Sequence, residues 1–150
     1  MKRQDIREHL FRLLFRVEFT DSREYEEQTD LYFNSPSEEE DELDSGFSQK
    51  DDSYIREKYT AILNKIADLD SIVGDASKGW DLGRLGKVEL TILRLAAYEI
   101  IYDDDIPVGV AIDQAVELAK KYGQHESSSF VNGILGNIAR ISDEKDCQPQ

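Results

Sequence analysis

The segment from residue 87 to residue 102 constrains the fold of this chain more than any other. Its apolar residues surround the helix axis instead of forming one face: Val88, Leu90, Ile92, Leu93, Leu95, Ala96, Ala97, Ile100 and Ile101. A helix that is apolar all round is usually buried by neighbours on several sides. We therefore expect a central helix whose two interior charges, Arg94 and Glu99, each have a partner, because an unpaired buried charge is costly.

Apolar residues before this segment recur at the spacing of amphipathic helices. The pattern predicts a helix over about residues 3–19, a weaker helix over 22–34, and one long helix whose apolar stripe begins at Ile55 and fades near Gly74. Residues 80–86 are expected to form a short helical turn, because their glycines limit its length.

Two further helices are expected after the central one. Pro107 is placed as a first-turn proline, and this helix closes at Lys120, Lys121 and Gly123, where basic residues and a glycine are favoured. The last helix begins at Ser127 or Ser128. The expected buried faces are Val108, Ile112, Ala115, Ala119 and Tyr122 for the first of these helices, and Phe130, Val131, Ile134, Leu135 and Ile138 for the second. Since no segment shows sustained strand alternation, the prediction is an all-α fold of six or seven helices.

Charge is distributed unevenly along the chain. With 32 acidic and 18 basic residues the net charge is −14, which argues against a protein that coats nucleic acid through a bulk positive field. Most of the excess lies within residues 21–52, and its carboxylates predict a mobile loop at about 36–50 without the ligand spacing of a calcium site. Residues 142–150 are expected to be a polar tail after a single helical domain over 1–141.

Several classes of protein are excluded by what the sequence lacks. Cys147 is the only cysteine, so no intrachain disulfide is possible and a reducing, cytoplasmic location is expected. Charges interrupt every candidate signal segment, and no apolar run is long enough to cross a membrane. His9 and His125 lie in no nucleophile motif, and His9 is expected at the boundary of a buried helix face. We therefore expect no catalytic residue, no metal site and no cofactor.

Three blocks of the sequence, found in a fixed order, together resemble the pattern of a known protein family. They are Arg7-Glu8 before Leu13-Leu14-Phe15, then Trp80-Asp81-Leu82-Gly83-Arg84-Leu85 leading into residues 92–100, and finally residues 107–123 followed by Phe130-Val131-Asn132-Gly133-Ile134-Leu135. With these blocks the chain resembles the NusB family of bacterial transcription antitermination factors. The resemblance covers about two thirds of the chain, and the Phe-Val-Asn-Gly block is its most specific part.

The resemblance implies a pair of three-helix bundles and a non-catalytic, RNA-binding adaptor. In such a family the protein pairs with the ribosomal protein NusE, and the two bind the single-stranded boxA element of nascent ribosomal RNA transcripts. The complex is then part of the RNA polymerase antitermination machinery. The alternative is a protein–protein scaffold of the same fold that does not bind RNA.

The resemblance, together with charge, also implies the RNA-binding residues. Lys2, Arg3 and Arg7 lie in the net-positive first twenty residues and are expected to contact phosphate; alternatively they only solvate a helix N-terminus. The second half of the expected site lies around the turn before the last helix and at the entry to the central helix: Glu89, Tyr122, Glu126, Ser127 and Phe130.

Alternatives and departures remain at this second half. Tyr122 is expected to stack on a base, although Tyr122 and Phe130 also fit the buried faces of their helices. The helix N-terminus after Ser127 is suited to a phosphate. Ser129 stands where the family often has a lysine, and Gln4 and Asp5 dilute its usual arginine cluster. These departures lower the positive potential, so RNA affinity without the partner is expected to be weak.

Overall fold

A computed structural model describes residues 2–17, 24, 27, 30–32, 48–78 and 86–146 of the chain. Regular structure within these residues is helical, which confirms the predicted all-α class. The chain divides into two compact units, Met1–Leu63 and Asn64–Gln150. The helical domain predicted over 1–141 covers the first unit and most of the second. Residues 80–85 of the predicted turn and residues 36–47 of the predicted loop lie outside the described residues.

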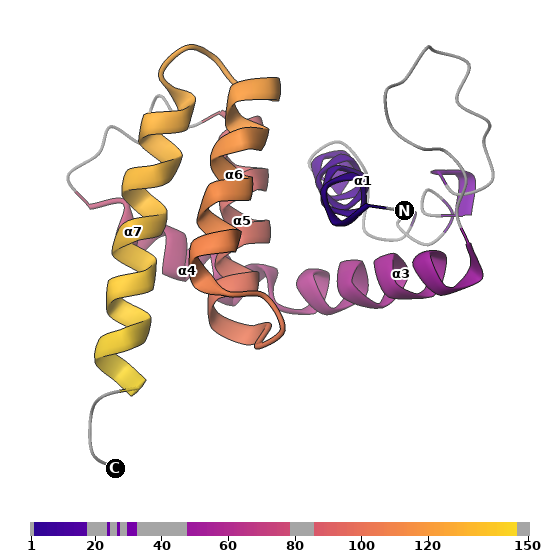
Figure 1. Ribbon diagram of the computed structural model, residues 1–150, viewed down its shortest axis with the longest axis horizontal. Helices are drawn as coiled ribbons and strands as arrows, with labels where there is room; N and C mark the ends of the chain where they lie inside the picture. The colour runs from indigo at the N-terminus through magenta and orange to yellow at the C-terminus, as the bar shows by residue number, and fades with distance from the viewer. Residues whose placement is uncertain are drawn as a thin grey trace. The chain divides into compact units, whose positions relative to one another are not determined.

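The first unit contains helix α1, Arg3–Arg16, and most of helix α3, Gln49–Asn64 (Figure 1). Helix α1 ends at Arg16 with Val17 as its C-cap, earlier than the predicted end at residue 19. Helix α3 begins at Gln49, where the hydroxyl of Ser48 accepts the backbone N–H of Asp51 at 3.1 Å. The last two residues of the predicted 36–50 loop are therefore helical. A serine at this place satisfies one of the N–H groups that a helix start leaves open.

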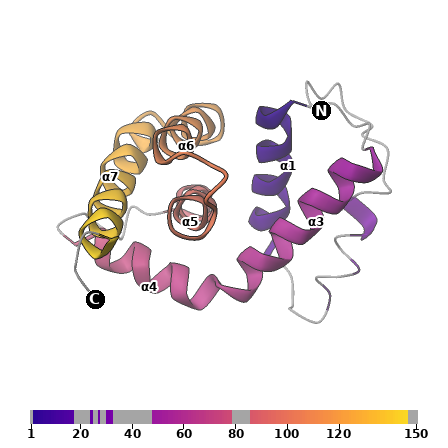
Figure 2. The ribbon, with the colours of Figure 1, turned by 60° about the horizontal axis from the view of Figure 1, so that its bottom comes forward.

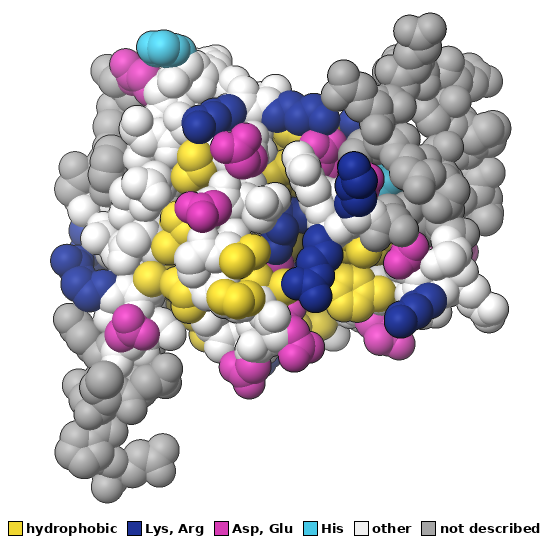
Figure 3. All heavy atoms as spheres, viewed as in Figure 1, with side chains coloured by type: hydrophobic (Ala, Val, Ile, Leu, Met, Phe, Trp, Pro, Cys, Tyr) yellow, Lys and Arg dark blue, Asp and Glu magenta, His cyan; other side chains and the backbone are white. Residues whose placement is uncertain are grey.

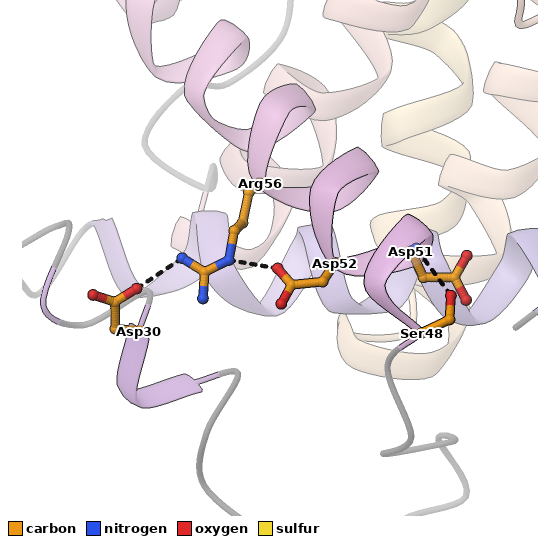
Figure 4. A network of polar contacts seen from close by, with 5 residues as sticks. All are labelled: Asp30, Ser48, Asp51, Asp52 and Arg56. Atoms are coloured by element: carbon orange, nitrogen blue, oxygen red, sulfur yellow. Dashed lines mark hydrogen bonds and ion pairs between the residues drawn. The ribbon is translucent and has the colours of Figure 1, made fainter.

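Arg56 of α3 lies between two carboxylates of the first unit (Figure 4). Its Nη1 donates to Asp30 at 2.7 Å and its Nε donates to Asp52 at 2.5 Å, one turn earlier on α3. Desolvation lowers the pKa of the Arg56 guanidinium, but hydrogen bonds and charges from Asp30 and Asp52 outweigh this and raise its pKa above the ordinary value. The described part of the predicted 22–34 helix is thus attached to α3.

His9 and Tyr32 make a second contact within this unit. His9 is 5% exposed, so it lies inside rather than at the boundary of the buried face of α1. Its Nδ1 forms a hydrogen bond with the hydroxyl of Tyr32, and the guanidinium of Arg16 lies 4.8 Å from the centre of the same tyrosine ring. These contacts connect α1 to the segment at residues 30–32.

The second unit contains α4, Ile66–Ala76; α5, Lys87–Tyr102; α6, Val108–Tyr122; and α7, Ser127–Asp146. Helix α5 contacts all three of the others, and Figure 2 shows it nearly end-on with α4, α6 and α7 around it. Its residues Thr91 to Ala97 are all buried, and Leu93 is 0% exposed. The prediction of a central helix is confirmed within this unit.

The prediction of one long helix from Ile55 to Gly74 is wrong. Helix α3 ends at Asn64, and Lys65 has φ −110° and ψ 6° before α4 begins at Ile66. These angles fall outside the helical region, so the helix is interrupted at one residue. The apolar spacing continues across Lys65 and therefore gives no sign of the break.

Helix α6 differs from its prediction at its start. Pro107 is the N-cap rather than a first-turn residue, with φ −59° and ψ 143°, and its carbonyl accepts the N–H of Ala111 at 3.0 Å. Val108 was expected in the core but is 38% exposed, and Val110 is 43% exposed. The buried face is Ala111, Ala115, Leu118 and Ala119. Figure 3 shows hydrophobic side chains gathered over the lower part of α6, the end at which the helix begins.

The remaining predictions for this unit concern its interior charges and its last helix. Arg94 is 8% exposed and pairs with Asp70 of α4, as expected, and Glu99 is 1% exposed. Helix α7 begins at Ser127 and continues to Asp146, so the predicted tail over 142–150 is helical in its first five residues. Phe130 is only half-buried, whereas Val131, Ile134, Leu135 and Ile138 are buried as predicted. Within the described ranges, no helix is both long enough and apolar enough to span a membrane.

Candidate functional site

The turn between α6 and α7, at the top of Figure 1, is joined to the start of α5 by one serine. The hydroxyl of Ser127 donates to Oε1 of Glu89 at 2.5 Å and accepts the backbone N–H of Gln124 at 2.9 Å. Ser127 is 6% exposed, and Glu89 is half-buried in the first turn of α5. The structure thus places in direct contact two residues that the resemblance implied as members of one site.

Two glycines leave the space in which these contacts form. A Cβ at Gly123 would lie 2.7 Å from the carbonyl oxygen of Ala119 and 2.7 Å from Oγ of Ser127. The backbone of Gly123, with φ −92°, is open to any residue, so this glycine is required by close packing and not by its conformation. A Cβ at Gly86, the N-cap of α5, would lie 2.6 Å from Oε2 of Glu89.

The other predicted residues of this half lie beside the same turn. Tyr122 ends α6 and is half-buried, with Nζ of Lys121 5.6 Å from the centre of its ring. Glu126 is exposed, and its backbone carbonyl accepts the N–H of Phe130 at 3.2 Å. The intermediate exposure of Tyr122 and Phe130 allows part of each ring to pack inside the unit and part to face solvent.

The basic residues predicted to contact phosphate belong to the other unit, at the start of α1. Lys2 and Arg3 are exposed, as a phosphate ligand must be. Arg7 is 7% exposed and is already engaged with another group of the protein. The three residues predicted as one cluster therefore differ: Lys2 and Arg3 are open to solvent, and Arg7 is a buried cation.

Sequence reasoning did not identify Gly86 as part of this arrangement. A glutamate three residues after the residue that caps a helix is a recognised signal, because its carboxylate can fold back over the helix start. Gly86 and Glu89 have that spacing at the start of α5. Among the residues that the structure describes, no group of three histidine, cysteine, aspartate or glutamate side chains is arranged to hold a metal ion.

Comparisons with known proteins identify the family. The sequence pattern of the NusB family matches residues 4–140. The "Transcription antitermination protein NusB" of Lachnoclostridium phytofermentans is 49% identical over 138 residues, which cover 92% of this chain and 98% of the relative. The protein of the same name from Agathobacter rectalis is 48% identical over 139 residues, covering 93% and 100% of the two chains.

Two solved structures are similar over nearly the whole chain. The structure of T. maritima NusB superposes with a TM-score of 0.76 at 32% identity, covering 97% of this chain and 96% of the other. A chain in the crystal structure of a plectonemic RNA supercoil superposes with a TM-score of 0.72 at 26% identity, covering 93% and 94%. By sequence and by fold, this chain belongs to the NusB family.

Proposed function

We propose that this protein is a non-catalytic RNA-binding adaptor that acts in transcription antitermination in the cytoplasm. The observation that carries the proposal is the match to proteins named "Transcription antitermination protein NusB", at 48% and 49% identity over more than nine tenths of the chain. Its proposed partners are the ribosomal protein NusE, the RNA polymerase antitermination complex and a single-stranded, boxA-type RNA.

The chemistry of the α6–α7 turn supports single-stranded RNA as the ligand. Sequence-specific recognition of RNA targets unstacked bases, which stack on aromatic rings and are read by polar groups at their edges. Tyr122 and Phe130 are half-buried aromatic residues at this turn, and the exposed Glu126 offers a carboxylate as a hydrogen-bond acceptor. The fold is also shared with a protein crystallised with RNA.

Phosphate contacts are proposed for the start of α1. Lys2 and Arg3 are exposed there, whereas the burial of Arg7 gives it a smaller part in direct contact. Two exposed cations supply few phosphate contacts, and the net charge of −14 adds no overall attraction for RNA. This balance supports a mechanism in which NusE contributes much of the affinity.

The proposal is tested by comparing a boxA-like RNA with a scrambled RNA of the same composition, each with and without purified NusE. We expect the protein alone to bind weakly, and the pair with NusE to bind the boxA-like RNA more tightly than the scrambled one. Equal affinity for the two RNAs would contradict the proposal. Binding of NusE without any binding of RNA would instead favour the scaffold function.

A further inference from the structure

We infer that Ser127 and Glu89 form a clamp that holds the α6–α7 turn in the shape in which it binds RNA. In this role Ser127 is a positioning residue and not a direct RNA ligand. The inference rests on the proposed function, since the turn matters for binding only if RNA binds there. It is carried by the two hydrogen bonds of the Ser127 hydroxyl and by the packing around Gly123.

The hydroxyl of Ser127 already acts both as a hydrogen-bond donor and as an acceptor within the protein. A serine has one hydrogen to donate and two lone pairs that accept. The hydrogen goes to Glu89, and one lone pair receives the N–H of Gln124. Since Ser127 is also only 6% exposed, it can donate to RNA only by releasing Glu89. The simplest use of this hydroxyl is to hold the turn.

Glu89 attaches the turn to α5, the central helix of the second unit. It lies in the first turn of α5, and the seven residues from Thr91 to Ala97 that follow are all buried. Gly123 packs so closely against Ala119 and Ser127 that no side chain fits there. A turn fixed in this way loses little conformational entropy when a ligand binds, and that loss otherwise weakens binding.

The clamp also determines which part of the RNA suits the turn. The N-terminus of a helix normally attracts phosphate through its free N–H groups and its dipole. Here the carboxylate of Glu89 accepts a hydrogen bond from the first residue of α7, so a negative charge is already present at that helix start. A phosphate would be repelled by this charge. We therefore assign bases, and not phosphates, to this side of the turn.

A double-mutant cycle on RNA affinity tests the clamp, using the protein paired with NusE and the boxA-like RNA. Ser127→Ala and Glu89→Ala should each weaken binding by up to about tenfold, the effect of one lost hydrogen bond of ordinary strength. The double variant should bind no more weakly than Ser127→Ala alone, because that change already removes the contact with Glu89. Glu89→Gln keeps an acceptor oxygen for Ser127 and should retain affinity within about twofold.

Amide hydrogen exchange in the free protein separates the clamp from RNA binding. Ser127→Ala should raise the exchange rate of the Gln124 amide by about tenfold, because that N–H loses its acceptor. Ser129→Ala is the matched control, since Ser129 is exposed on the same helix turn, and it should leave this rate unchanged.

Three outcomes overturn the inference or its basis in distinguishable ways. If the effects of Ser127→Ala and Glu89→Ala add, or if Glu89→Gln loses as much affinity as Glu89→Ala, then Glu89 contacts RNA directly and the positioning role is wrong. If Ser127→Ala leaves both exchange and affinity unchanged, the clamp does not exist. If the wild-type pair does not bind the RNA at all, it is the proposed function that fails, and amide exchange alone then decides whether the turn is clamped.

Discussion

Arg94 and Asp70 are joined by two parallel hydrogen bonds that connect α5 to α4. Nε of Arg94 donates to Oδ1 of Asp70 at 2.7 Å, and Nη2 donates to Oδ2 at 2.9 Å. The arginine side chain is 10% exposed and the aspartate side chain is 41% exposed. A planar guanidinium matches a carboxylate in this two-point geometry, which adds direction as well as strength. A charge on the central helix is thereby satisfied at the edge of the second unit.

Removing the carboxylate should destabilise the protein, because Arg94 would remain nearly buried without these acceptors. Asp70→Ala should lower the free energy of unfolding by about 1–3 kcal/mol, the range for a buried polar group that loses hydrogen-bond acceptors. The loss should be smaller than for a fully buried ion pair, since Asp70 reaches solvent. Urea denaturation measures the change.

The control for this prediction is Asp75→Ala, also in α4. Asp75 lies 4.0 Å from Lys78, and the two side chains are 70% and 82% exposed, so their interaction is screened by water. We expect a change within about 0.5 kcal/mol. Equal losses for Asp70→Ala and Asp75→Ala would contradict a stabilising role for the Arg94 contact.

Leu93 tests the central position of α5. Its side chain is 0% exposed, so Leu93→Ala leaves a cavity and should lower the free energy of unfolding by about 2–5 kcal/mol. Val110→Ala on α6 removes apolar atoms from a residue that is 43% exposed and should change stability by no more than about 0.5 kcal/mol. Chemical denaturation of the two variants should separate them clearly. A loss at Leu93 as small as that at Val110 would mean that α5 is not central.

The central position of α5 could be predicted from the sequence, because apolar residues on all sides of a helix indicate burial on all sides. The break at Lys65 left no such trace, since a single residue outside the helical region does not disturb the spacing of the apolar residues around it. Pro107 was placed one residue too far into α6, because its fixed φ suits a first-turn position and its N–H is not needed there. Local composition therefore predicted which segments are helical better than where each helix begins or ends.

The candidate site depended on a different kind of information. The resemblance named Glu89 and Ser127 as residues of one site but did not imply a contact between them. Their hydrogen bond joins residues 38 positions apart, and only the packing of α7 against α5 creates it. In the same way, Arg3 and Arg7 lie four residues apart in α1, yet Arg3 is exposed and Arg7 is only 7% exposed. Burial of this kind depends on tertiary contacts that a helical periodicity does not encode.

Gly123 and Gly136 should respond in opposite ways to the same substitution. A Cβ at Gly123 would lie 2.7 Å from a backbone oxygen, so Gly123→Ala must shift the turn and should destabilise the protein by about 1–3 kcal/mol. Gly136 lies within α7 and has open space around it, so Gly136→Ala should stabilise by up to about 1 kcal/mol through helix propensity. Thermal unfolding of both variants checks the difference in sign. A neutral Gly123→Ala would show that the turn yields easily.

Tyr122 should contribute to RNA binding through its ring. Tyr122→Ala is expected to weaken binding to the boxA-like RNA by about 1–3 kcal/mol if a base stacks on it, and Tyr122→Phe should retain most of the affinity because it keeps the ring. The slope of affinity against salt concentration should stay the same in both variants, since no phosphate contact is removed. Because Tyr122 is half-buried, unfolding must be measured alongside binding. A loss of affinity explained entirely by unfolded protein would assign Tyr122 to packing alone.

Alanine substitutions at Arg3 and Arg7 should have different effects, the first on RNA affinity and the second on the free energy of unfolding. Arg3 is exposed, so Arg3→Ala should weaken RNA binding and reduce the salt slope by about 0.7, the value for one lost contact to single-stranded phosphate, while unfolding is unchanged. Arg7 is 7% exposed and engaged within the protein, so Arg7→Ala should lower the free energy of unfolding, by about 1–3 kcal/mol. Arg140→Ala, an exposed arginine on α7, removes the same charge outside the proposed site and should leave the slope unchanged. A slope that falls equally for Arg3→Ala and Arg140→Ala would reflect net charge alone, and the phosphate contact at the start of α1 would be wrong.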